Sequence, residues 1–171
     1  ALHGHLPFIH HPEHEFFLEE DWLFEGVADC YLPLLFMMDG WAKDGVRAQI
    51  TMGLSPPLLS MLAQPTLRER TARYLEGRRT LARRYQETLS ADSPFRAAVA
   101  FAIEEAEHAI DRYASCGRDL AQAFAAHHLG GRVEIMTCSA THGLAPVLQD
   151  PHVIRAQVGE DHVILGLSGG V

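Results

Sequence analysis

Histidine dominates the start of the chain. The opening segment, ALHGHLPFIHHPEHEFFLEEDW, holds five histidines within its first fourteen residues. Two of them, His3 and His5, are two positions apart, so on an extended strand both imidazoles point to the same side of the sheet. An imidazole can ligate a metal, exchange hydrogen bonds with a polar substrate, or serve as an ordinary structural side chain. These residues alone leave all three interpretations open.

A further histidine follows another predicted strand. Residues 132–143, RVEIMTCSATHG, begin with compact apolar and β-branched residues and end polar, which predicts a buried strand that delivers Thr141 and His142 into a loop. Since α/β folds place their chemistry at strand ends, we expect His142 to meet His3 and His5 there. The pair His-x-His is also similar to the start of metal-dependent amidohydrolases, but zinc would need further ligands. Of the later strand ends, Ser55 and His142, only the second offers a suitable one.

Trp22 and Cys138 lie near these histidines in the predicted fold. Trp22 opens a predicted helix, where its ring is either core or a surface that stacks on the apolar face of a sugar. Cys138 lies within a strand as a small apolar residue and has no identifiable activating base, which argues against a nucleophilic thiol.

The remaining histidines receive structural interpretations. His10, His11 and His14 lie in a polar loop that contains proline, and we expect them to be solvated. His127 and His128 precede Gly130 and Gly131, where imidazolium groups would complement the end of a helix.

Periodicity predicts the framework that positions these residues. Residues 19–43 predict a helix interrupted at Pro33 and Gly40, and residues 46–54 predict a strand. Ser55, as a possible cap, then precedes a run of helices. We expect these helices within residues 56–62, 66–89 and 93–131, the last breaking near Cys116 and Gly117. After the strand of residues 132–143, residues 151–158 predict a helix and residues 163–167 a short strand. This order indicates a parallel α/β architecture with a large helical insertion.

Composition narrows the class of protein. The 171 residues are 47% apolar and carry a formal charge of −8, which suits one core and argues against a nucleic-acid partner. The three cysteines include no C-x-x-C pair, which favours reduced thiols and a cytoplasmic location. No apolar run approaches the roughly 20 residues that cross a bilayer, so no membrane partner is expected.

Three segments together resemble a known family: residues 2–35, which contain His-Gly-His-Leu-Pro; residues 45–59, which contain Leu-Ser-Pro-Pro-Leu; and residues 130–148, which contain Ala-Thr-His-Gly. In this order they resemble the amino-terminal part of glycoside hydrolase family 57, particularly its 1,4-α-glucan branching enzymes. The resemblance covers residues 1–158. It implies an incomplete (β/α)7 barrel, a distorted relative of the TIM barrel, with a helical insertion between its second and third strands.

The resemblance also implies a chemistry. Family members act on α-glucans without metal or organic cofactor, through a glutamate nucleophile and an aspartate acid and base. Transfer to a glucan hydroxyl then forms an α-1,6 branch. Matched to the family motifs, His3, His5 and His142 would hydrogen-bond to the donor sugar, and Trp22 would line the acceptor groove. Ser139 departs from the asparagine common in the family, which removes one polar contact near the site.

The chain starts with Ala1 and changes character at Gly159, so we expect an amino-terminal fragment with a divergent or truncated tail at residues 159–171. The segments that bear the nucleophile and the acid would then lie beyond Val171, and this stretch alone would be inactive. Alternatives are an α-amylase or a 4-α-glucanotransferase of the same family, a metal-dependent hydrolase built on His3 and His5, and a noncatalytic glucan-binding remnant.

Overall fold

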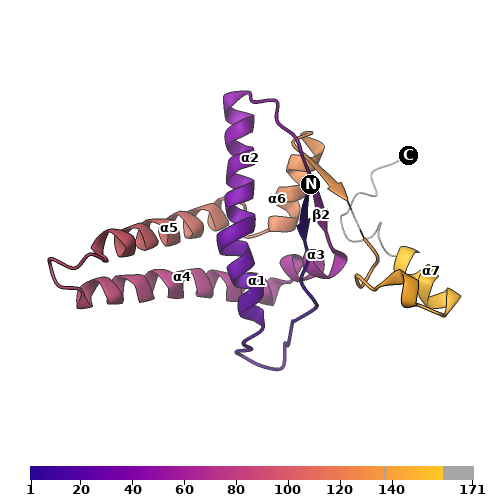
Figure 1. Ribbon diagram of the computed structural model, residues 1–171, viewed down its shortest axis with the longest axis horizontal. Helices are drawn as coiled ribbons and strands as arrows, with labels where there is room; N and C mark the ends of the chain where they lie inside the picture. The colour runs from indigo at the N-terminus through magenta and orange to yellow at the C-terminus, as the bar shows by residue number, and fades with distance from the viewer. Residues whose placement is uncertain (137, 160–171) are drawn as a thin grey trace.

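Three parallel strands form the sheet of the molecule. The computed structural model describes residues 1–136 and 138–159, and all three strands lie within them. The strands are β1 (Leu2–Gly4), β2 (Ile50–Leu54) and β3 (Val133–Met136), hydrogen-bonded in the order β1-β2-β3. Successive strands run in the same direction and are joined by helices (Figure 1), which confirms the predicted α/β class.

A nearly continuous helical rod connects β1 to β2. It consists of α1 (Glu20–Gly26), a π-helical turn η1 (Val27–Tyr31) and α2 (Leu32–Asp44). The predicted interruption at Gly40 is wrong, whereas the α-helical pattern is interrupted just before Pro33, by the π-helical turn that ends at Tyr31. Pro33 lies in the first turn of α2, where its missing N–H costs nothing, and α2 continues through Gly40. Gly45 then ends the rod with a φ of 67°, a backbone conformation that glycine adopts without strain.

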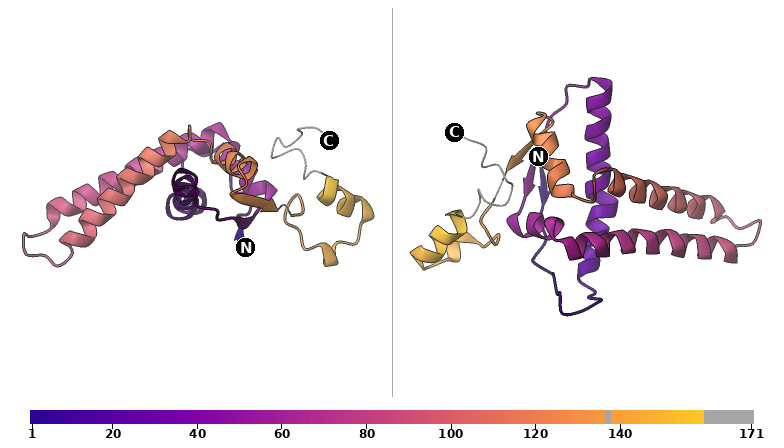
Figure 2. Two further views of the ribbon diagram at one scale, coloured as in Figure 1. Left: turned by 90° about the horizontal axis from the view of Figure 1, so that it is seen from above. Right: turned by 180° about the vertical axis from the view of Figure 1, so that it is seen from behind.

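The predicted helical insertion lies between β2 and β3. Its helices are α3 (Pro56–Ala63), α4 (Pro65–Thr88), α5 (Arg96–Ser115) and α6 (Leu120–Leu129). The expected break follows α5, where Gly117 has a φ of 65°. α4 and α5 lie side by side and project away from the sheet, on the side opposite to α7 (Pro151–Gly159), as Figure 2 shows from two directions.

The strands are shorter than predicted. β2 begins at Ile50 rather than at residue 46, because the segment after Gly45 first has to return from the end of the rod to the sheet. β3 ends at Met136, and a short 3-10 turn, Ala145–Val147, follows the loop that carries His142. The predicted strand over residues 163–167 lies outside the described residues. In the part that is described, no helix is long and apolar enough to cross a membrane.

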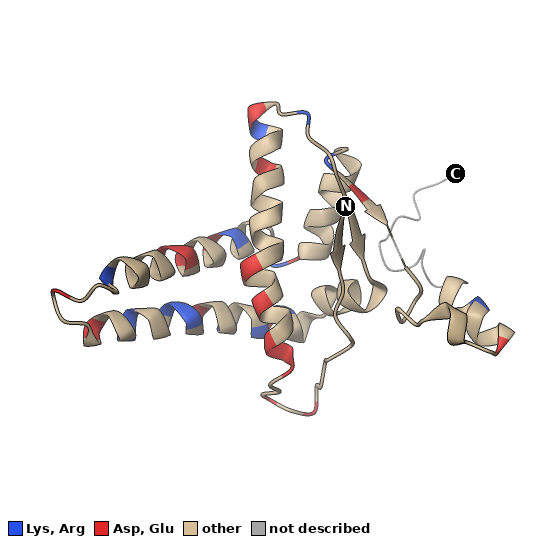
Figure 3. Ribbon diagram, in the orientation of Figure 1, with Lys and Arg blue, Asp and Glu red and all other residues tan. Residues whose placement is uncertain are grey.

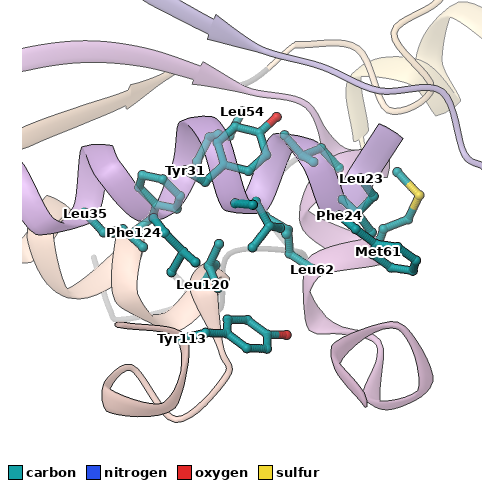
Figure 4. Packing of buried hydrophobic residues seen from close by; sticks show 14 of the residues in the cluster. Leu23, Phe24, Tyr31, Leu35, Leu54, Met61, Leu62, Tyr113, Leu120 and Phe124 are labelled. Atoms are coloured by element: carbon teal, nitrogen blue, oxygen red, sulfur yellow. The ribbon is translucent and has the colours of Figure 1, made fainter. Parts of the chain in front are cut away.

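The core lies between one face of the sheet, the rod and the helices α3 and α6 (Figure 4). Leu54 of β2, Tyr31 of the rod and Phe124 of α6 are buried in it, and the rings of Tyr31 and Phe124 meet edge to face with centroids 6.3 Å apart. Burial of these large apolar side chains stabilises the fold and fixes the carboxyl ends of the strands.

Candidate functional site

Three imidazoles from opposite ends of the chain meet at the carboxyl ends of the strands. His3 lies within β1, His5 directly follows it, and His142 lies in the loop after β3. The Nε2 atoms of His3 and His142 are 3.2 Å apart, and the ring centroids of His5 and His142 are 4.0 Å apart at an interplanar angle of 70°. The rings of His3 and His5 stack with centroids 6.2 Å apart. The structure therefore brings together the three histidines that the sequence singled out.

The strand β2 shapes the floor beneath His3. His3 pairs with Gly53 across the sheet, and a Cβ at Gly53 would lie 2.9 Å from Nδ1 of the imidazole. Real Cβ atoms essentially never approach another heavy atom so closely, so only glycine leaves room for this ring. The strand thus admits the imidazole by lacking a side chain.

Ser55, at the end of β2, holds His5. Its hydroxyl lies 3.0 Å from Nδ1 of His5. Ser55 occupies the N-cap position of α3, as the sequence predicted, but its side chain makes no capping hydrogen bond there. The hydroxyl is fully buried and serves the imidazole instead, which sequence reasoning missed because the contact spans 50 residues.

The loop that carries His142 is tied down at several points. The His142 N–H donates to the carbonyl of Ser139 at 2.7 Å, and the Ser139 hydroxyl donates to the carbonyl of Gly143 at 3.2 Å. Gln157 of α7 accepts from the Thr141 N–H at 3.0 Å and donates to its hydroxyl at 2.8 Å. His142 itself has a φ of 57°, a conformation uncommon for a residue other than glycine. The loop is therefore built to hold one imidazole in a fixed place.

The electrostatics of this cluster favour a neutral ring at His5. Burial lowers the pKa of His5 below its usual range, and positive charge on His142 and His3 would lower it further. A hydrogen bond between two Nε2 atoms also requires that one of them lacks a proton. The imidazoles contact one another and Ser55, and no carboxylate contacts them in the described part of the chain. Neutral imidazoles both donate and accept, which suits the hydroxyls of a polar, uncharged ligand.

Metal ligation was the competing interpretation of His3 and His5. Within the residues that the structure describes, no group of three or more histidine, cysteine or carboxylate side chains has the arrangement of a metal site.

Trp22 and Cys138 are the two other residues that the sequence placed near the histidines. Trp22 is 51% exposed on α1, and the ring contacts that join the three histidines do not include it. Its predicted place in an acceptor groove stays a prediction. The thiol of Cys138 is half-buried and donates to the carbonyl of Ser139 at 3.6 Å.

The prediction that the histidine-rich loop is solvated is wrong for His10. Its side chain is 6% exposed, and its Nδ1 lies 3.2 Å from a carboxylate oxygen of Glu20. That carboxylate is 1% exposed and accepts two hydrogen bonds of 2.7 Å from Arg70 of α4. It also accepts from the backbone N–H of His11, and Arg70 donates to the carbonyl of His14 at 2.5 Å. The loop is thus folded around a buried ion pair.

The predicted imidazolium cap at His127, near the end of α6, is also corrected. His127 is buried, and Arg132 donates from Nε to its Nδ1 at 3.0 Å, so this nitrogen carries no proton. Nε2 of His127 faces Asp39 at 3.2 Å, while burial lowers the pKa of the ring. His127 therefore links α6 to α2 as a neutral side chain.

Comparison with known proteins adds a family to this geometry. The family model described as glycosyl hydrolase family 57 matches residues 1–165. A 1,4-α-glucan branching enzyme of Thermococcus kodakarensis is 27% identical over 159 residues, which cover 92% of this chain and 23% of that enzyme. The crystal structure of that enzyme, obtained with glucose and additives, matches with a TM-score of 0.88 at 24% identity, over 97% of this chain and 30% of that one.

Two further solved structures share the fold. A branching enzyme of the glycosyl hydrolase family 57 type, from Pyrococcus horikoshii, matches with a TM-score of 0.89 at 27% identity, over 96% of this chain and 32% of that one. An α-amylase from Thermotoga maritima matches with a TM-score of 0.84 at 36% identity, over 92% of this chain and 30% of that one. The chain therefore spans between about a quarter and a third of the length of these relatives.

Proposed function

Because the chain belongs to glycosyl hydrolase family 57, we propose that its three clustered histidines bind one glucose unit of an α-1,4-glucan. The observation that carries this proposal is the convergence of His3, His5 and His142 on one point at the carboxyl ends of the strands. A sugar hydroxyl both donates and accepts hydrogen bonds, and neutral imidazoles present both functions. The sheet, in this proposal, is part of a (β/α)7 barrel.

The cluster is suited to binding rather than to bond cleavage. Retaining transfer needs a carboxylate nucleophile and a carboxylic acid on either side of the scissile bond. The contacts of the three imidazoles include Ser55 but no carboxylate in the described part of the chain. We therefore assign these residues to the donor sugar, and the two carboxylates to other segments of the full-length protein. Hydrogen bonds that strengthen as the sugar ring distorts would then lower the barrier.

Branching is the activity that we favour, and the two archaeal branching enzymes support it. Amylolytic activity is the second candidate, because the matched α-amylase has the higher identity, 36%. A 4-α-glucanotransferase would share the same donor site. These activities differ in the acceptor that takes the glucan, either water, a chain end or a hydroxyl within a chain.

Product analysis separates the three activities. The full-length protein, as its gene encodes it, is incubated with amylose, and the linkages are counted by proton NMR. New α-1,6 linkages are expected. Shortened linear chains with new reducing ends would indicate an amylase instead, and redistributed linear chains a glucanotransferase.

A binding measurement tests the histidine assignment itself. Titration calorimetry with maltoheptaose should show affinity reduced about tenfold in His3→Ala and in His142→Ala, as expected for one lost hydrogen bond to a polar ligand. His108→Ala is the matched control, because His108 is exposed on α5. Unchanged affinity in both site variants would contradict the assignment. Stoichiometric zinc in protein purified without added metal would favour the hydrolase alternative.

A further inference from the structure

A second recess lies at the same end of the molecule as the histidine cluster. We call it the α1–α4 cleft; it lies between the loop after β1, the start of α1 and α4, and its volume is about 380 Å³. That volume falls within the range of roughly 300 to 1,000 Å³ typical of small-ligand sites. The loop leaves the carboxyl end of β1 and passes below the sheet before α1 begins (Figure 1).

The walls of the cleft are fixed before any ligand arrives. The buried pair of Glu20 and Arg70 joins the start of α1 to α4, and the loop is hydrogen-bonded to both of its members through His10, His11 and His14. Acidic positions at the start of α1 lie beside the arginines of α4 in Figure 3. A binding surface that is already ordered loses little conformational entropy when it binds.

Aromatic rings form much of the lining. Phe16, Phe17, Phe24 and Tyr74 all border the cleft. Phe16 is 72% exposed, so its ring is accessible to a ligand. The rings of Phe24 and Tyr74 contact each other with centroids 5.5 Å apart, so the floor is rigid. Flat apolar faces of this kind stack on the apolar faces of sugar rings.

Polar groups of both signs lie between the rings. Arg70, Arg73 and the three carboxylates of Glu15, Glu20 and Asp21 border the cleft, and of these Arg70 pairs with Glu20. Arg73 is exposed on α4, whereas the Nε of Arg70 is buried and has no hydrogen-bond partner among the described residues. Burial and the charge of Glu20 raise the pKa of Asp21. The side chains that border the cleft include both hydrogen-bond donors and carboxylate acceptors, and a neutral polyhydroxyl ligand can use both.

We propose that the α1–α4 cleft binds a segment of an α-glucan chain, as a second carbohydrate site apart from the histidine cluster. The proposal rests on the proposed function for the identity of the sugar. Phe16 stacks on a glucose ring, and the guanidinium of Arg73 donates to its hydroxyls. The cleft thereby holds the glucan at a second point, which raises its affinity for longer chains relative to glucose.

Titration calorimetry of the full-length protein with maltoheptaose tests this site. Phe16→Ala and Arg73→Gln should each weaken binding about tenfold. Both side chains are exposed, so these variants should fold, and their melting temperatures should match that of the wild type. Phe95→Ala is the matched control, because Phe95 is similarly exposed, at 61%, and lies outside the cleft. Its affinity should not change.

A parallel titration of His3→Ala separates the two proposals. If Phe16→Ala and Arg73→Gln bind like the wild type while His3→Ala binds weakly, the cleft proposal is overturned and the histidine site stands. If the cleft variants bind weakly and His3→Ala is unaffected, the cleft binds the glucan and the histidine assignment fails. A wild-type protein that does not bind maltoheptaose would overturn both.

Discussion

Replacement of Gly53 by alanine should displace His3 without harming the fold. The added Cβ would lie 2.9 Å from Nδ1 of His3, and ordinary contact begins at 3.4 Å, so the ring has to withdraw by about 0.5 Å. The Nε2 atoms of His3 and His142 are already 3.2 Å apart, and a displacement of this size away from His142 takes them beyond hydrogen-bonding distance. A hydrogen bond of this kind contributes about 1 kcal/mol.

The expected consequence is a loss of glucan affinity without a loss of stability. A displaced His3 that loses its hydrogen bond to the sugar weakens binding by about 1 kcal/mol, which corresponds to roughly a fivefold rise in the dissociation constant for maltoheptaose. Alanine is otherwise favoured over glycine within a strand by about 0.5 to 1 kcal/mol, which offsets the cost of moving the ring. The melting temperature should therefore stay close to that of the wild type.

Titration calorimetry measures the loss of glucan affinity in Gly53→Ala, and NMR of the histidine side chains measures the displacement of His3. Gly77→Ala is the control, because a Cβ at Gly77 meets nothing within 4 Å. It should bind maltoheptaose like the wild type and leave the imidazole signals unchanged. If Gly53→Ala also keeps both its affinity and the His3 and His142 signals, the geometry deduced for the cluster is wrong.

Three other perturbations probe the parts that support the cluster and the cleft. Since burial depresses the pKa of His5, folding stabilises the neutral form of its ring. Protein stability and glucan affinity should therefore be intact above pH 6.5, the unperturbed pKa, and should fall as the pH drops below it. In a pH series, His5→Asn should lose less stability and less affinity than the wild type. Glu20→Gln leaves Arg70 buried without its counter-charge. The free energy of unfolding, measured by urea denaturation, should fall by about 3 kcal/mol. A loss below about 1 kcal/mol would contradict the role of this ion pair. Gln157→Ala removes both side-chain hydrogen bonds to the loop that carries His142. It should weaken maltoheptaose binding about fivefold and leave the melting temperature unchanged. Full affinity would show that other contacts hold the loop.

Local patterns in the sequence were enough to predict the outline of the site. The spacing of His3 and His5 requires them to share a side of a strand, and the apolar run before His142 requires a strand end. Parallel pairing of the strands then brings these ends to one edge of the sheet. The α/β class and the insertion between β2 and β3 follow from the same alternation of strand and helix patterns.

Contacts between distant residues were beyond such patterns. The pairing of Glu20 with Arg70 spans 50 residues, and neither residue differs locally from the exposed charges around it. Gln157 is one polar residue on a mostly exposed helix, and its role follows only from the position of the loop beside it. Ser55 carried a local signal, that of a helix cap, which tertiary structure overrode in favour of His5.

The distance along the chain between His3 and His142 sets the order in which the molecule can be completed. The two imidazoles are separated by 139 positions, so their contact belongs to the slowest class of native contacts to form. At roughly 5 to 20 residues per second on the ribosome, His142 is synthesised about 7 to 28 seconds after His3. During that interval β1 can pair with β2, but the cluster stays incomplete, so its assembly marks a late event in the biogenesis of this part of the protein.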